Sequence, residues 1–104
     1  MNKFENGKIY KIVDNTTNVV YVGSTCKTLK QSLKGHEYVH KFFKPGKYPN
    51  NVTVFKILGN NNYTIELIEL YPCNNKQELN IRESKTIQQF RNEMVLFSLN
   101  LMKE

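Results

Sequence analysis

Two tyrosine side chains, Tyr10 and Tyr21, are the first candidates for chemistry in this chain. They lie in two short runs rich in Ile, Val and Tyr, residues 7–13 and 19–24, which a polar loop of Asp, Asn and Thr separates. This pattern predicts a β-hairpin, because β-branched and aromatic residues favour strands while Asp, Asn and Thr clusters favour turns. Two neighbouring hydroxyls on a rigid hairpin would suit phosphate or water chemistry.

The register of the hairpin decides whether the two phenols meet. If the loop is residues 14–17, Val13 pairs with Asn18 and Tyr10 lies opposite Tyr21. Directly opposed residues share a face of the ladder, so both hydroxyls would point the same way. The ordinary alternative is that both rings are cross-strand aromatics of the core, since tyrosine favours strands. The hairpin by itself does not separate these two interpretations.

The length and composition of the chain predict one soluble globular domain over residues 1–104. No apolar run reaches the ~20 residues that a membrane helix needs. The first residues lack the features of a signal peptide. Cys26 and Cys73 lack metal-ligand spacing and are expected to be reduced thiols. We therefore expect an intracellular protein, cytoplasmic or, in a eukaryotic host, nuclear.

The positive charge of the chain favours a polyanionic partner. The formal net charge is +6, and six lysines lie between residues 27 and 47. This stretch is the best candidate for a surface that contacts a phosphate backbone, although an ordinary solvated helix face would also be lysine-rich. The residues that we expect to bind DNA are Lys27, Lys30, Lys34, His40 and Lys41.

The remaining elements follow from periodicity and turn residues. We expect a helix over 25–43 capped by Thr28, a loop over 44–51, a strand or short helix over 52–58, a strand over 63–71, a helix over 76–89, and a short apolar tail over 94–102. The strand over 63–71 places Ile65, Leu67 and Glu69 on one face and Glu66, Ile68 and Leu70 on the other. This order predicts an α+β fold, a small antiparallel sheet of about three strands flanked by helices.

Four segments, taken together, resemble the GIY-YIG nuclease family. They are Lys8 to Tyr10, Tyr21 to Thr25, Leu29 to His36 and Glu78 to Ser84. Each segment is weak alone, but their order and spacing cover nearly the whole chain. Lys8 stands where the family name has Gly, and Val22 where it has Ile. The resemblance implies a DNA endonuclease that hydrolyses phosphodiester bonds with one divalent metal.

The resemblance also implies roles for single residues. Tyr10 would activate the attacking water and Tyr21 would position that water or the scissile phosphate. Gly23 would let the backbone turn tightly into the helix. Glu83 would hold a single Mg²⁺ or Mn²⁺, a lone carboxylate being suited to an ion that keeps most of its waters. Two further matches are His36, beside the phosphate or the base, and Asn100, with Asn92 as the alternative.

One position departs from the family in a way that affects catalysis. Ser32 stands where the family carries a nearly obligatory Arg, whose planar guanidinium would contact the scissile phosphate through two parallel bonds. Losing one such transition-state contact typically costs ~10²–10³ in rate. We therefore expect cleavage by this chain to be impaired, and a non-catalytic DNA-binding module of the same fold is the alternative.

A second motif suggests different chemistry. Residues 36–40 read His-Glu-Tyr-Val-His, the H-E-x-x-H spacing that places two imidazoles on one helix face for zinc. A zinc peptidase is the remote alternative, because no third ligand follows at a short interval. The family resemblance also carries expectations about partners. A DNA-recognition domain outside this chain is one, and a homodimer is another, because a single site cuts only one strand.

Overall fold

The computed structural model describes the backbone of residues 2–42 and 52–102, and side chains as far as Arg91 except that of Val52. Its elements are a 3₁₀ turn η1 (Lys3–Asn6), β1 (Lys8–Asp14), β2 (Val20–Thr25), α1 (Leu29–Phe42), α2 (Val52–Gly59), β3 (Tyr63–Leu70) and α3 (Lys76–Met102). The loop predicted over 44–51 lies outside the described residues. None of the described helices is long and apolar enough to cross a membrane.

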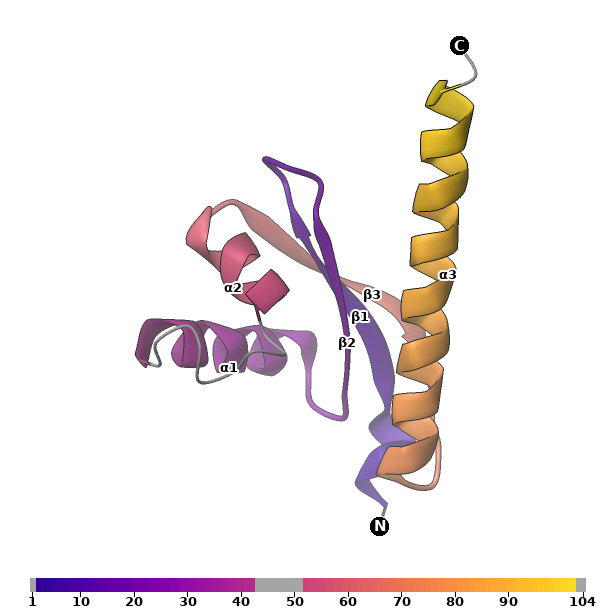
Figure 1. Cartoon of the computed structure of the whole chain (residues 1–104). Helices are drawn as coiled ribbons and strands as arrows, with labels where there is room; N and C mark the ends of the chain where they lie inside the picture. Colours follow the sequence, from indigo (N-terminus) through magenta and orange to yellow (C-terminus); the bar gives the residue numbers. More distant parts are fainter. Residues whose placement is uncertain (1, 43–51, 103–104) are drawn as a thin grey trace.

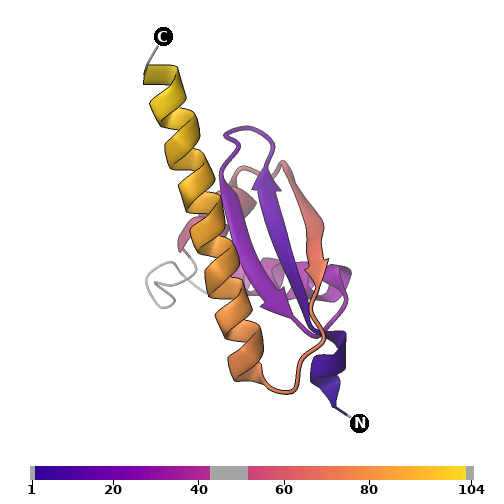
Figure 2. The same ribbon diagram turned by 90° about the vertical axis from the view of Figure 1, so that its right-hand side faces the viewer.

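A three-stranded antiparallel sheet separates two helical layers. The strand order is β2-β1-β3, so the first strand of the chain is central and β2 is an edge. Helices α1 and α2 lie on one side of the sheet and α3 lies along the other (Figures 1 and 2). The predicted α+β class, with its small antiparallel sheet flanked by helices, is therefore confirmed.

Each face of the sheet has its own hydrophobic cluster. On the α1 and α2 side, Tyr10 and Ile12 of β1 pack with Val54 and Ile57 of α2. On the α3 side, Ile9 and Val22 pack with Leu79 of α3. Successive residues of a strand point to opposite faces, so Ile9 and Tyr10 feed different clusters. This alternation places the Tyr10 phenol in the layer that contains α1.

The predicted register of the hairpin is wrong by two residues. Tyr10 lies opposite Gly23, and Tyr21 lies opposite Ile12. The turn is longer than predicted because Asp14 closes it, accepting the N–H of Asn18 and donating its own N–H to the Val19 carbonyl. A shift by two residues preserves the face of every side chain. The two tyrosines therefore still point to the same side of the sheet, as neighbours on a diagonal.

The structure resolves one open expectation about the helices, confirms the Thr28 cap and joins two predicted segments. The segment over 52–58, open between strand and helix, is the helix α2, whose buried residues fill one cluster. Helix α1 begins after Thr28, where Thr28 and Gln31 bond each other's backbone N–H through their side chains. The predicted helix over 76–89 and the apolar tail form one helix of 27 residues.

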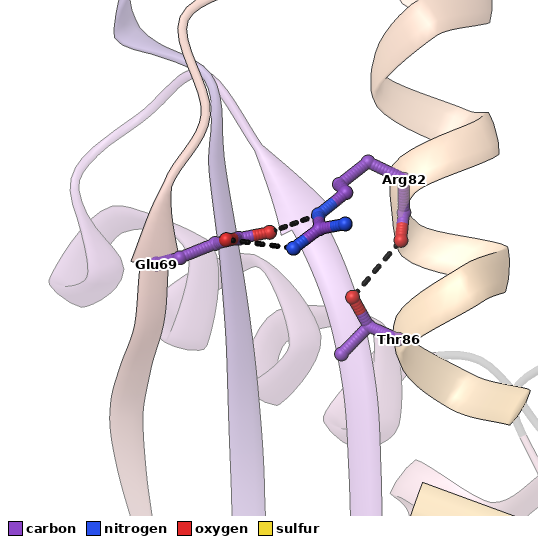
Figure 3. A network of polar contacts seen from close by, with 3 residues as sticks. All are labelled: Glu69, Arg82 and Thr86. Atoms are coloured by element: carbon purple, nitrogen blue, oxygen red, sulfur yellow. Dashed lines mark hydrogen bonds and ion pairs between the residues drawn. The ribbon is translucent and has the colours of Figure 1, made fainter. Parts of the chain in front are cut away.

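A β-bulge in β3 corrects the predicted faces of that strand. Opposite the step from Ile9 to Tyr10, the partner in β3 changes from Glu69 to Leu67, which leaves Ile68 as the extra residue. Glu69 therefore faces α3, not the side of Leu67, and its carboxylate accepts two bonds from Arg82 (Figure 3). The Arg82 carbonyl in turn accepts the Thr86 hydroxyl. The turn of α3 that carries Glu83 is thus anchored to the sheet.

Candidate active site

Three aromatic side chains from β1, β2 and α1 meet beneath the first helix. The ring centroids of Tyr10 and Tyr21 are 6.4 Å apart, and that of His36 lies 6.2 Å from Tyr10 and 5.4 Å from Tyr21. The Tyr10 hydroxyl lies 2.7 Å from His36 Nε2, within hydrogen-bond distance. His36 reaches the sheet because it follows Leu29 and Leu33 on the inward face of α1.

Burial sets the protonation of this cluster. It raises the pKa of the Tyr10 phenol, and the charges of Tyr21 and Glu83 raise it further. Burial and the charge of Glu83 also raise the pKa of Tyr21. Burial lowers the pKa of His36, because the imidazolium form loses its hydration. At neutral pH the cluster therefore consists of two neutral phenols and a neutral imidazole.

Gly23 has a different role from the one expected. It lies within strand β2, not at a turn, and directly opposite Tyr10. A Cβ at position 23 would lie 2.6 Å from the Tyr10 hydroxyl oxygen and 3.0 Å from a Tyr21 ring carbon. The first distance is shorter than packed side chains allow, and the second is tighter than an ordinary van der Waals contact. Glycine is required here because the Tyr10 phenol lies across the backbone of the partner strand.

A carboxylate approaches the same edge strand from the other face. Glu83 of α3 accepts a hydrogen bond from the Ser24 hydroxyl, with 2.8 Å between Ser24 Oγ and Glu83 Oε1. Neighbouring residues of α3 thus reach opposite edges of the sheet, since Arg82 bonds Glu69 of β3. Among the described residues, no bond to Glu83 Oε2 is found and no three His, Cys, Asp or Glu side chains cluster as metal ligands.

The hydroxyl of Ser32 bonds to β2 and not to the tyrosine cluster. Ser32 Oγ donates to Thr25 Oγ1 at 2.8 Å, at the end of β2. Ser24 and Thr25, two adjacent residues, thus contact Glu83 and Ser32 respectively. The end of β2 joins the α1 side of the site to the α3 side.

Residues 6–96 match the sequence model of the GIY-YIG catalytic domain. The chain belongs to the GIY-YIG catalytic domain family. Its fold is similar to that of the catalytic domain of the homing endonuclease I-TevI, with a TM-score of 0.64 and 21% sequence identity, over 85% of this chain and 91% of that one. Among proteins with curated descriptions, none matches the sequence significantly.

The GIY-YIG domain also accounts for the H-E-x-x-H segment. Its three polar side chains have three different neighbours, although their spacing suits zinc. His36 contacts Tyr10, the Glu37 carboxylate accepts the Tyr63 hydroxyl, and the His40 ring lies 5.6 Å from the Phe55 ring. In the part of the chain that the structure describes, these side chains do not form a metal cluster.

The structure describes the side chains of some of the remaining predicted site residues but not of others. Lys30, Lys34 and Lys41 are exposed and recur at helical spacing along α1, and Lys27 is exposed just before it. The His40 ring packs toward α2 instead. The contact of the four lysines and of His40 with DNA stays a prediction. Asn100 and its alternative Asn92 belong to α3, but their side chains lie outside the described residues.

Sequence reasoning quoted Ser24 and Thr25 in the Tyr21 to Thr25 segment but assigned them no role. Their positions directly after Gly23, in a segment that matches the family, were the signal in the sequence that could have pointed to a role. Two successive residues of an edge strand point to opposite faces, so one can reach α3 while the other reaches α1. Their partners could not be predicted, because each hydrogen bond joins residues that the fold brings together.

Proposed function

We propose that this chain is the catalytic domain of a DNA endonuclease that hydrolyses phosphodiester bonds by metal-assisted attack of water. One observation carries the proposal: the Tyr10, Tyr21 and His36 cluster and the Glu83 carboxylate lie on either side of one edge strand. The pKa of both tyrosines responds to the charge of Glu83, so the two groups are electrostatically coupled. Membership of the GIY-YIG family supports the same reaction class.

The proton of the attacking water passes through Tyr10 to His36. Because its pKa is raised, Tyr10 is a neutral phenol at neutral pH and cannot act as a preformed phenolate. With His36 in its Nδ1–H tautomer, the unprotonated Nε2 accepts from the Tyr10 hydroxyl, and the lowered pKa of His36 keeps the ring neutral before the reaction. As water attacks phosphorus and the bond from phosphorus to the leaving oxygen breaks, Tyr10 takes the water's proton and gives its own to His36, and the leaving oxygen takes a proton from solvent. Tyr21 orients the water or the phosphate beside this pair.

The carboxylate of Glu83 fits a hydrated divalent cation. One of its oxygens is held by Ser24, and a lone carboxylate with waters and phosphate oxygens suits Mg²⁺ or Mn²⁺. When bound, such an ion stabilises the charge that develops on the phosphate and on the leaving oxygen. The chain's own contribution is to orient Glu83, through Ser24 from β2 and through the anchoring of Arg82 to Glu69.

Cleavage by this chain is weak because position 32 supplies no cation. The Ser32 hydroxyl is bonded to Thr25 and is neutral, so it cannot replace a guanidinium at the phosphate. The two arginines of the chain lie on α3, and Arg82 is already paired with Glu69. A non-catalytic DNA-binding module remains the second candidate for the same reason. Double-strand cleavage would take two protomers or two sequential nicks, and sequence specificity would come from an appended recognition domain.

The test is the variant Ser32→Arg, assayed on supercoiled plasmid with Mg²⁺ or Mn²⁺. Nicking should rise at least tens-fold, because a guanidinium restores one transition-state contact. The matched control is Ser32→Lys, which restores the charge without the planar fork and should recover less. Unchanged nicking by a folded Ser32→Arg protein would overturn the assignment of position 32. Retardation of DNA without nicking in every variant would favour the non-catalytic module.

A further inference from the structure

A lysine-rich pocket lies beside the site. It has a volume of about 340 Å³, within the lower range of small-molecule sites, and lies between η1, the end of β2 and the start of α3. Three lysines from separate parts of the chain line it: Lys3, Lys27 and Lys76. Only Lys27 was expected to contact DNA, so the fold adds two cations that sequence spacing did not group together.

The charge of this pocket is unbalanced. No carboxylate is among its lining residues, and none of the three lysines forms an ion pair within the described residues. The acidic residue of the first turn of α3, Glu78, points its carboxylate at the backbone N–H of Asn74. Three like charges around one hollow repel each other and so favour an anion between them. Asn80 adds an amide to the lining.

The pocket shares residues with the contacts around Glu83 and Ser32. Ser24 and Thr25 line it, while the Ser24 hydroxyl bonds Glu83 and the Thr25 hydroxyl accepts from Ser32. An anion in the pocket therefore lies next to the scissile position. Each strand of duplex DNA carries one phosphate per about 3.4 Å of helix axis, so a strand that places one phosphate at Glu83 brings its neighbours close by.

We propose that the pocket formed by Lys3, Lys27 and Lys76 is a phosphate site that holds a second phosphate of the bound strand beside the scissile one. The proposal rests on the proposed function for its DNA ligand, but a free phosphate would present the same chemistry. The pocket supplies positive charge near the bound strand, whereas Ser32 is neutral and supplies none. It positions the strand and does not touch the reacting atoms, because the pocket does not include Tyr10, Tyr21 or Glu83.

The first arm of the test measures affinity for a fluorescent duplex against salt concentration. The double variant Lys3→Gln with Lys76→Gln should flatten the log–log slope by about 0.9, the loss of one phosphate contact, and weaken binding about eightfold at 0.1 M salt. The matched control, Lys56→Gln with Lys85→Gln, removes the same charge from exposed lysines outside the pocket. Equal losses in both double variants would overturn the site.

The second arm identifies the source of the phosphate. Backbone amide shifts of the wild-type chain are recorded during titration with a thymidine dinucleotide or with inorganic phosphate. Shifts at Cys26, Lys27 and Asn80 with the dinucleotide support the site on a DNA strand. Shifts with inorganic phosphate alone overturn that placement, and no shifts with either probe overturn the site. This arm needs neither cleavage nor duplex binding. It therefore detects anion binding in the pocket even if the proposed function is wrong.

Discussion

Two carboxylates at opposite ends of the sheet differ in how many hydrogen bonds they accept within the protein. Asp14, at the hairpin turn, is only 1% exposed, and both of its oxygens are bonded. Oδ1 accepts the N–H and the hydroxyl of Thr16, and Oδ2 accepts the Asn60 amide. The Thr16 hydroxyl, followed by the Asn60 amide and Thr16 N–H, lowers the pKa of Asp14 despite its burial. Asp14 ties the hairpin to the segment after α2.

Glu83, near the other end of the sheet, has the opposite arrangement. Its Oε1 accepts one bond from Ser24, and its neighbours Tyr10 and Tyr21 respond to its charge through raised pKa values. A carboxylate accepts about four bonds, so Asp14, which already accepts three within the protein, has little capacity left for a ligand. A carboxylate held by one bond is oriented and still able to coordinate. The number of bonds already accepted, not the residue type, separates Asp14 from Glu83, the proposed metal ligand.

The largest expected effect comes from Glu83→Gln in the Ser32→Arg background. Mg²⁺-dependent nicking should fall by about 10³-fold, because several kcal/mol of transition-state stabilisation depend on the metal. Duplex affinity should stay nearly unchanged, and Mn²⁺ binding, measured by electron paramagnetic resonance, should be lost. Retained nicking would mean that another carboxylate holds the metal, with Glu37 the next candidate.

Two controls belong to this experiment. Tyr10→Phe in the same background removes the hydroxyl that bonds His36 and should lower nicking by ~10²–10⁴ while Mn²⁺ binding persists. Asp14→Asn should keep both nicking and Mn²⁺ binding per folded molecule. Loss of Mn²⁺ binding in the folded Asp14→Asn protein would contradict the contrast between the two carboxylates.

The contrast extends to paired and unpaired lysines. Lys30 and Lys34 of α1 are exposed and have no ion pair within the described residues, whereas Lys11 lies 3.6 Å from Glu66. Replacing Lys30 and Lys34 by Ala should flatten the salt slope of duplex binding by up to ~2 and weaken all sequences alike. Lys11→Ala should leave the slope unchanged. If the salt slope does not change when Lys30 and Lys34 are replaced, the DNA surface lies elsewhere. The pocket lined by Lys3 and Lys76 would then be the next surface to test.

The smallest effect concerns acid stability. Because the pKa of Asp14 is depressed in the folded state, its stabilisation is fully present above the ordinary aspartate value of about 3.9 and is lost as pH falls below it. Asp14→Asn should therefore lower the urea midpoint at pH 7, and its difference from wild type should shrink steadily as the pH falls from about 4 toward about 2. A difference between the two proteins that stayed constant across this range would mean that the Asp14 charge does not stabilise the fold.

The sequence determined the elements that depend on neighbours along the chain. The hairpin, the Thr28 cap and the strand over 63–70 follow from local composition, and the family resemblance, now confirmed, follows from the order of short motifs. The shared face of Tyr10 and Tyr21 survived a wrong register because a shift of two residues preserves side-chain direction. Local patterns determine such features because their causes lie within a few residues.

Only the tertiary structure decided which distant residues meet. The bulge at Ile68 places Glu69 on the face of the sheet where Arg82 lies. Because successive residues of β2 point to opposite faces, Ser24 contacts Glu83 and Thr25 contacts Ser32. The reason for Gly23 likewise became visible only with Tyr10 across it. These contacts join residues that are far apart in sequence, so no local periodicity encodes them. They arise when packing of the two clusters fixes the strand register and the position of α3, because only then are the partner atoms in place.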